Sequence, residues 1–251
     1  MQTGKAGAPV SQISQAYPDR VEVRGRDLCG DLMGRLSFTE YFHLLLTGRE
    51  PTADQRFFLD LLLVAIAEHG MMPTNVAARM TLAADPGSLQ GAVAAGILGC
   101  GPVILGTSEA CARLLAETVS SGRAPSDVVR EIRDAGGRVP GFGHPVHRPV
   151  DPRAERILEL ADDRGVAGRH VALARELADA VAEACGESLT MNVSLPLAAV
   201  LLDLGIPVAA AKAVPILART AGLLAHLAEE RERPVGLVLA RAAEEAVEYE
   251  R

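Results

Sequence analysis

The 251-residue sequence contains no tryptophan and has few other aromatic residues, five Phe and three Tyr. A chain with so few aromatic rings has little with which to stack on nucleic acid bases. It also lacks an excess of positive charge, because 25 Lys and Arg stand against 32 Asp and Glu, which gives a net charge of −7. Without a general basic surface to attract a phosphate backbone, we expect no nucleic acid partner.

Cysteine is scarce as well. The four cysteines include no Cys-x-x-Cys pair; they are Cys29, Cys100, Cys111 and Cys185. Closely spaced cysteine pairs are a common zinc signature, and disulfide frameworks belong to oxidising compartments. The sequence therefore predicts no metal site and a reducing, cytoplasmic location.

Long uncharged runs are also missing. The stretch most worth testing as a membrane span, Gly91–Gly106, has 16 residues and contains five glycines and Pro102. A helix needs about 20 apolar residues to cross a bilayer. The first residues, MQTGKAGAPVSQ, do not have the apolar core of a signal peptide. We expect a soluble protein that makes no contact with a membrane.

What the sequence does contain is helical periodicity, in a chain that is 49% hydrophobic and 23% charged. Thr52 and Gln55 read as a capping box, and Asp151 reads as an N-cap. Extended structure is expected only near Arg20–Arg24. The predicted fold class is all-α, with helices over residues 52–68, 88–106, 108–119, 126–135, 151–163, 169–185, 195–204, 208–230 and 235–248.

The segment 139–153, VPGFGHPVHRPVDPR, carries the residues best suited to chemistry. Its glycines expose backbone N–H groups to a ligand. His144 is suited to general acid catalysis, and Arg153 offers a planar fork for a carboxylate in the first turn of a helix. Spacing alone leaves a second interpretation open, a tight turn before a capped helix.

This segment resembles the signature of the citrate synthase family, Gly-aromatic-Gly-His followed by Asp-Pro-Arg. Other blocks resemble the family in the same order, and together they cover about residues 20 to 240. They are VRGRDL at 23–28, LLLTGREP at 44–51, EHGMMPTNVAAR at 68–79, NVS at 192–194, LGIP at 204–207 and ARTAGLLAH at 218–226. The resemblance is to the short, citryl-CoA lyase type, because a single helix fills the space between residues 51 and 69.

The resemblance implies an all-α homodimer in which a smaller helical domain is inserted into a larger one. The larger domain would contain residues 1–75 and 195–251, and the smaller one residues 76–194. Closure of the small domain would exclude water from the cleft between them. The implied reaction is cleavage or formation of a carbon–carbon bond between a CoA thioester, acetyl-CoA, and a keto acid, oxaloacetate. No cofactor is implied beyond the CoA of the substrate.

The resemblance also implies roles for particular residues. His69 would stabilise the enolate of the thioester, and His144 would move the proton on the keto or hydroxyl oxygen. Arg153 and Arg219 would bind substrate carboxylates, and Arg233 would reach in from the partner subunit. The CoA-binding residues would be Val139, Pro140, Gly141, Phe142, Gly143 and Arg148.

Ser194 departs from the family pattern. It stands where the family has an aspartate that removes a proton from the acetyl methyl group, and a serine hydroxyl is not a useful base near pH 7. Three interpretations follow: a lyase that does not need this base, a condensing enzyme that uses a decarboxylating malonyl-type thioester, or an impaired acyl-CoA- or carboxylate-binding homologue. His147 replaces a residue that is usually aromatic, and the resemblance gives it no role.

Overall fold

The computed structural model describes residues 10–250. The chain divides into two units, with the boundary between Leu59 and Asp60. Each unit is described separately below.

The first unit begins with a small antiparallel sheet in the order β1 (Ser14–Ala16), β2 (Val21–Val23) and β3 (Arg26–Asp27). The prediction of extended structure near residues 20–24 is confirmed for β2. Its two neighbours, at three and two residues, are too short to show an alternating pattern. A π-helix, Leu28–Leu32, and helix α1 (Phe38–Thr47) complete this unit.

The named secondary-structure elements of the second unit are all helical, in agreement with the all-α prediction. They are α2 (Ala53–Ala67, which begins in the first unit), α3 (Pro73–Ala84), α4 (Leu89–Leu98), α5 (Thr107–Ser121), α6 (Pro125–Asp134), α7 (Pro152–Asp163), α8 (Arg169–Cys185), α9 (Ser194–Asp203), a 3-10 turn (Val208–Ala210), α10 (Ala213–Glu232) and α11 (Gly236–Ala246). Both predicted caps form: Thr52 Oγ1 accepts the N–H of Gln55, and the Asp151 carboxylate accepts the N–H of Arg153.

Three expectations about helix boundaries were wrong. The helix predicted to continue to residue 106 ends at Leu98, because the glycines and Pro102 that follow turn the chain. The helix predicted over 208–230 is broken after the 3-10 turn, so Pro215 lies in the first turn of α10, where proline is tolerated. Helices α1 and α3 were not among the predicted helices.

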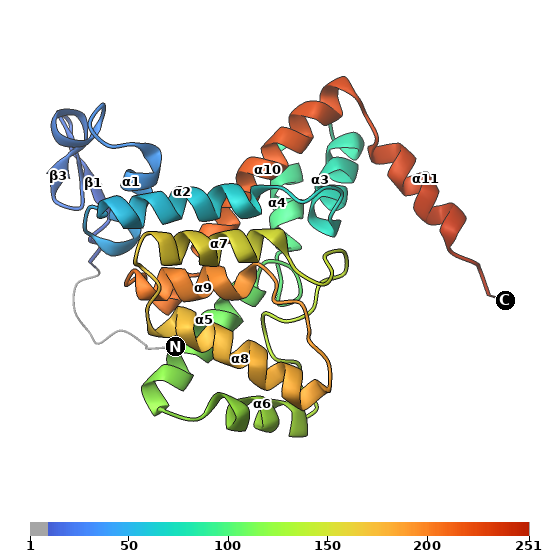
Figure 1. Cartoon of the computed structure of the whole chain (residues 1–251). Helices are drawn as coiled ribbons and strands as arrows, with labels where there is room; N and C mark the ends of the chain where they lie inside the picture. The colour runs from blue at the N-terminus through green and yellow to red at the C-terminus, as the bar shows by residue number, and fades with distance from the viewer. Residues whose placement is uncertain (1–9, 251) are drawn as a thin grey trace. The chain divides into compact units, whose positions relative to one another are not determined.

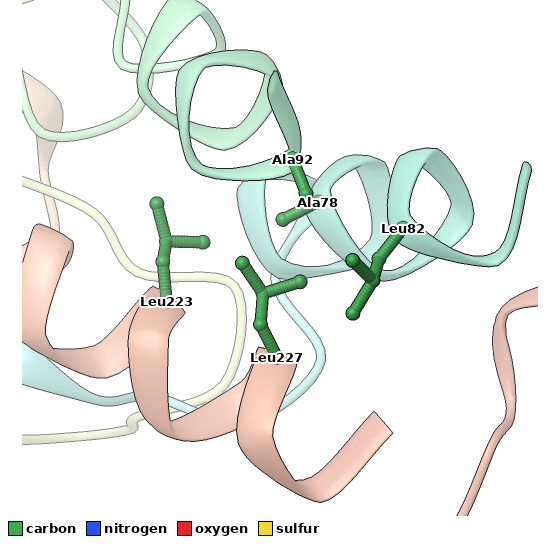
Figure 2. Packing of buried hydrophobic residues seen from close by; sticks show 5 residues of the cluster. All are labelled: Ala78, Leu82, Ala92, Leu223 and Leu227. Atoms are coloured by element: carbon green, nitrogen blue, oxygen red, sulfur yellow. The ribbon is translucent and has the colours of Figure 1, made fainter. Parts of the chain in front are cut away.

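The helices of the second unit pack in two groups. In one, α3 and α4 pack against α10, and α11 packs against α3; in the other, α5, α7 and α8 pack against α9, and α6 packs against α8. Figure 2 shows the core of the first group, in which Leu223 and Leu227 of α10 lie against the side chains of Ala78 and Leu82 of α3 and Ala92 of α4. The division at residues 75/76 and 194/195 stays a prediction.

Helix α9 is the centre of the second group and lies beside α7 and α8 (Figure 1). Every residue from Leu195 to Leu201 is buried. A helix that is apolar on all sides is covered on all sides. This burial fixes the helix whose first residue is Ser194.

The segment Val208–Glu232, which contains α10, is long and apolar enough to cross a membrane, and within residues 10–250 it alone meets that criterion. Of its apolar window, 44% is buried inside the protein. Core helices of soluble proteins pass the same test, so the finding is only a weak indication of a membrane.

A buried ion pair joins three helices of the first group. The Arg79 side chain of α3 is 1% exposed and donates to Glu230 at the end of α10, at 2.9 Å, and also to Glu229. The second carboxylate oxygen of Glu230 accepts the backbone N–H groups of Val235 and Gly236, where α11 begins. The Arg79–Glu230 pair therefore ties α3, α10 and α11 together.

Replacing Arg79 by methionine should lower the free energy of unfolding by about 3–5 kcal/mol, because it leaves the Glu230 carboxylate buried without its counter-charge. Urea denaturation measures the loss. The matched control is Arg241→Met, which removes an exposed ion pair with Glu245 and should cost at most about 1 kcal/mol. Equal losses in the two variants would contradict the role of the buried pair.

Candidate active site

A cavity of about 470 Å³ lies within residues 60–250 and gathers most of the predicted catalytic residues. Its polar lining includes side chains from four separate segments of the chain: His69, His144, Arg153, Ser194 and Arg219. None of the described residues that line it carries a carboxylate. The cavity therefore presents hydrogen-bond donors and positive charge.

His69 lies in the turn between α2 and α3, and Glu68 holds that turn. One oxygen of the Glu68 carboxylate accepts the backbone N–H groups of His69 and Gly70, at 2.8 and 2.7 Å. Gly70 has a φ of +74°, and its carbonyl accepts a hydrogen bond from the Asn75 amide at 2.6 Å. The main chain that carries the His69 ring is thus fixed from both sides.

The other Glu68 oxygen lies 2.9 Å from Nε2 of His226 in α10. Nδ1 of His226 accepts a hydrogen bond from Arg79, which leaves the ring proton on Nε2, facing Glu68. Burial opposes the charged form of Glu68, but the hydrogen bonds from His226 and His69 outweigh burial and lower the pKa of the carboxyl group. Glu68 is therefore an anion that accepts every hydrogen bond around it.

Arg219 reaches the cavity because α10 approaches the end of α2 closely. A Cβ atom on Gly222 would lie 2.1 Å from the carbonyl oxygen of Ala67, so only glycine allows this approach. The Arg219 side chain donates one hydrogen bond to Asn75 at 3.1 Å, and its buried Nε has no partner among the described residues. A buried guanidinium with an unpaired N–H is suited to an anionic ligand.

Arg153 is held by the fully buried carboxylate of Asp151. That carboxylate accepts hydrogen bonds from Nε and Nη2 of Arg153 and from the N–H of Val193, at 2.8–3.1 Å. Burial disfavours the Asp151 anion, but Arg153 and the N–H of Val193 outweigh burial and keep the pKa of Asp151 below its usual value. Asp151 therefore orients the guanidinium toward the cavity and joins α7 to the start of α9.

The glycine-rich loop before His144 is paired with the segment before α9. The N–H of Gly143 donates to Thr190, and the N–H of Asn192 donates to the carbonyl of Gly141. Gly141 has a φ of +91°, and a Cβ atom there would lie 2.7 Å from the side chain of Leu195. Glycine is needed at this position for both conformation and space, and the close packing sets the place of His144.

The hydrogen bonds of His144 determine which of its nitrogens carries the proton. Nδ1 accepts the backbone N–H groups of Val146 and His147, at 3.0 and 2.8 Å. Because a backbone N–H can only donate, neutral His144 carries its proton on Nε2. Nη2 of Arg153 lies 3.4 Å from that nitrogen, and two donors cannot bond each other. These two N–H groups are therefore free to share one oxygen acceptor.

His147 completes a group of three imidazole rings. Its Nε2 lies 3.1 Å from Nε2 of His69, and its ring centroid lies 4.4 Å from that of His144. One ring nitrogen from each of the three residues lies within 4.8 Å of the other two, which is close enough for a metal ion. A metal-bound histidine usually donates its second N–H to an acceptor. Since Nδ1 of His144 faces two donors, the group favours hydrogen bonding to oxygen over metal ligation.

His69 and His144 both have a pKa below the ordinary value of a histidine, which favours the neutral imidazole at pH 7. Burial, followed by the charges of Arg153 and His147, lowers the pKa of His69. Burial, followed by the charge of His147, lowers the pKa of His144. A neutral imidazole with an N–H directed at a ligand donates a hydrogen bond without adding positive charge.

Residues 10–241 match the family model described as citrate synthase, C-terminal domain. The chain belongs to the citrate synthase family. It is 29% identical to citrate synthase of Haloferax volcanii over 200 residues, which are 78% of this chain and 52% of that protein. It is 36% identical to putative citrate synthase 2 of Mycobacterium tuberculosis (strain ATCC 25618 / H37Rv) over 189 residues, 72% of this chain and 49% of that protein. The chain thus spans about half the length of these curated relatives.

Two solved structures agree with the fold. Citryl-CoA lyase from Hydrogenobacter thermophilus superposes with a TM-score of 0.88 at 31% identity, over 98% of this chain and 95% of that one. ATP citrate lyase from Methanothrix soehngenii gives a TM-score of 0.82 at 20% identity, over 99% of this chain and 42% of that one, and shows the fold alone. The expected resemblance to the short, citryl-CoA lyase type of the citrate synthase family is confirmed.

Not every residue that the family pattern suggested lies at the cavity. Arg148 is exposed in the loop, and Arg233 is exposed at the end of α10; neither side chain lines the cavity. Two residues that position the site, Glu68 and Asn75, were not predicted to do so. Glu68 and Asn75 stood in the block quoted around His69, but their roles depend on contacts that a sequence pattern does not show.

Replacing Asp151 by asparagine should lower the free energy of unfolding by about 3 kcal/mol at pH 7. The asparagine amide puts an NH₂ group where a carboxylate oxygen accepted hydrogen bonds, so this group faces the N–H donors of Arg153 and Val193 without an acceptor. The pKa of Asp151 is lowered in the folded protein. The contribution of its anion to the free energy of unfolding is therefore complete above the unfolded pKa of about 3.9, and it is lost as the pH falls through the folded pKa. Urea denaturation should therefore show the gap between the two proteins narrowing below about pH 4.

Asp162→Asn is the control. Asp162 lies near the end of α7, the helix that Asp151 caps, and forms an exposed ion pair with Arg175 of α8. It should change stability by at most about 1 kcal/mol. A gap between wild type and Asp151→Asn that stays constant on acidification would rule out a charged Asp151 as the stabilising group.

Proposed function

We propose that this citrate synthase family member cleaves a citryl-CoA-type thioester into acetyl-CoA and oxaloacetate, and catalyses the reverse reaction slowly. One observation carries the proposal: the cavity joins His69, His144, Arg153 and Arg219 and has no carboxylate among its described lining residues. The likeness of the chain to citryl-CoA lyase from Hydrogenobacter thermophilus, over nearly the full length of both chains, supports the proposal. Cleavage needs hydrogen-bond donors at two oxygens and an acceptor for the hydroxyl proton, which water supplies, whereas condensation needs a base that removes a proton from carbon.

The two arginines would bind the carboxylates of the acid. Arg153 is oriented by Asp151, and Arg219 has an unpaired, buried Nε–H. Arginine binds carboxylates in a bidentate geometry that fixes the orientation of the ligand. A substrate with two or more carboxylates therefore matches the cavity in charge and in geometry.

The hydroxyl oxygen of the substrate would lie between Nε2–H of His144 and Arg153. From the sequence, His144 was predicted to take the hydroxyl proton during cleavage; we propose instead that it donates a hydrogen bond. Because Nδ1 accepts two backbone N–H groups, Nε2 is already protonated and acts as a donor. His144 and Arg153 would stabilise the alkoxide, and its proton would pass to water.

As the carbon–carbon bond breaks, its electron pair would move into the thioester to give an enolate. The alkoxide oxygen becomes the keto oxygen of oxaloacetate, and the enolate oxygen lies at His69. The enolate carbon then takes a proton from water, so protons balance over the cycle. Returning a proton to an enolate is easier than removing one from a methyl group, which suits a site that has Ser194 in place of a carboxylate.

The CoA part of the substrate would lie along the loop Val139–Gly143. Gly143 lines the histidine cavity, and Pro140 lines a second hollow of about 510 Å³. That hollow carries three cationic side chains, Arg113, Arg138 and Lys212, and two carboxylates, Glu109 and Glu117; Glu109 pairs with Arg113 and Lys212. We propose that Arg138 attracts the phosphates of CoA there, with Arg148 as a further, exposed cation beyond the loop.

We also propose that the enzyme is a cytoplasmic homodimer. Arg233 would then reach the cavity of the partner subunit, because its exposed position leaves it without a role in its own cavity. Helix α11 supports an interface, since Leu237 and Val238 are 72% and 63% exposed. The four cysteines are free thiols, as expected in a reducing compartment.

The direct test is to incubate the purified protein with citryl-CoA and to measure acetyl-CoA and oxaloacetate. Wild type should form both products, and His144→Ala should lower kcat by about 10²–10³-fold, because it removes one donor from the alkoxide. Arg156→Gln, which changes an exposed residue on the same helix as Arg153, is the control and should keep the wild-type rate. If wild type binds citryl-CoA but forms no product, the chain is a binding protein and the proposal is wrong.

Replacing Ser194 by aspartate should restore a base for carbon. Ser194 is the first residue of α9, and a carboxylate at the N-terminus of a helix is electrostatically favoured. In D₂O the variant should exchange the methyl protons of acetyl-CoA about 10²-fold faster than wild type, as measured by proton NMR. Ser194→Asn has nearly the same shape without the charge and should leave the slow exchange unchanged; equal acceleration by both variants would contradict the assignment.

A further inference from the structure

The closest ring nitrogens at the cavity are Nε2 of His69 and Nε2 of His147, at 3.1 Å. A hydrogen bond between them contains one proton, so one ring donates and the other accepts. Within the described residues the His69 ring has no second hydrogen-bond partner, and His69 lines the cavity whereas His147 does not. The direction of this bond decides what His69 offers to a ligand.

The two directions have opposite consequences. If His147 donates, neutral His69 carries its proton on Nδ1 and can donate it to a ligand. If His69 donates, its Nδ1 is a lone pair, which repels the oxygen of a thioester or an enolate. The neighbouring groups, His144, Arg153 and Arg219, are all donors. A lone pair on His69 would be the one mismatch in a site that is otherwise complementary to an anion.

We propose that His147 is a positioning residue that donates its Nε2–H to His69 and thereby places the His69 proton on Nδ1. This inference rests on the proposed function, because an enzyme that forms an enolate needs a donor at that oxygen. It assigns a role to a side chain for which the family resemblance gave none.

His147 is held firmly enough to act in this way. Its backbone N–H donates to Nδ1 of His144 at 2.8 Å, and its carbonyl accepts a hydrogen bond from Thr190 at 3.3 Å. Its ring lies against that of His144, with an interplanar angle of 30°. The same loop that determines the proton position of His144 thus carries the ring that determines the proton position of His69.

Nitrogen-15 NMR of the imidazole rings tests the inference without any assay of activity. The His69→Gln variant identifies the His69 signals in the spectrum. In the wild-type protein near pH 7, Nδ1 of His69 should be protonated and Nε2 should not. In His147→Phe, which keeps an aromatic ring but has no donor, the His69 proton should move toward Nε2. A wild-type His69 with its proton on Nε2, or an unchanged spectrum in His147→Phe, would overturn the inference.

Kinetics with citryl-CoA supply the second readout. His147→Phe should lower kcat by about 10- to 100-fold with little change in KM, because His69 loses the partner that orients its proton. His147→Gln should recover most of the rate, since its amide can still donate to His69. Val150→Ala, an exposed change in the same loop, is the control and should keep the wild-type rate. Equal rates for the Phe and Gln variants would contradict the inference.

The two readouts separate this inference from the proposed function. If wild type does not cleave citryl-CoA, the proposed function fails, and the NMR spectrum still decides which nitrogen of His69 is protonated. If citryl-CoA is cleaved but the His69 proton lies on Nε2, the proposed function stands and the role of His147 is wrong. Should His147→Phe fail to fold, the wild-type spectrum and the Gln variant give the answer.

Discussion

The buried carboxylate of Asp151 accepts hydrogen bonds from Arg153 and from the N–H of Val193. It caps α7, orients the guanidinium that faces the cavity, and anchors the start of α9, which carries Ser194. A buried anion with several donors is stable only while all of them stay in place. The geometry of this side of the cavity therefore depends on one side chain that makes no contact with the cavity itself.

The part of the cavity around His69 is organised by the same kind of interaction. The carboxylate of Glu68 accepts the backbone N–H groups of the turn that carries His69, and His226 and Asn75 join that turn to α10 and α3. Gly222 lets α10 approach closely enough for Arg219 to enter. Both acidic groups are used to hold donors in place, which leaves the cavity itself with donors and positive charge.

Much of this could be predicted from local sequence. Helical spacing predicted the fold class, and the Asp151-Pro152 pair marked the start of α7. The order of the family blocks indicated which histidines and arginines would meet, and the cavity contains His69, His144, Arg153 and Arg219. Helix α3 was missed, and the helix predicted to continue to residue 106 was too long. Periodicity gives a poor estimate of where glycine and proline end a helix.

The sequence by itself determined most of the helices, the family and the residue types available for chemistry, because these depend on local spacing and on ordered motifs. Tertiary structure alone decided how those residues are protonated and aimed. Whether Nε2 of His144 is a donor depends on two backbone N–H groups in its own loop, and the pairing of His69 with His147 joins residues far apart in the chain. Hydrogen-bond direction is set by three-dimensional neighbours, and a linear pattern does not encode it.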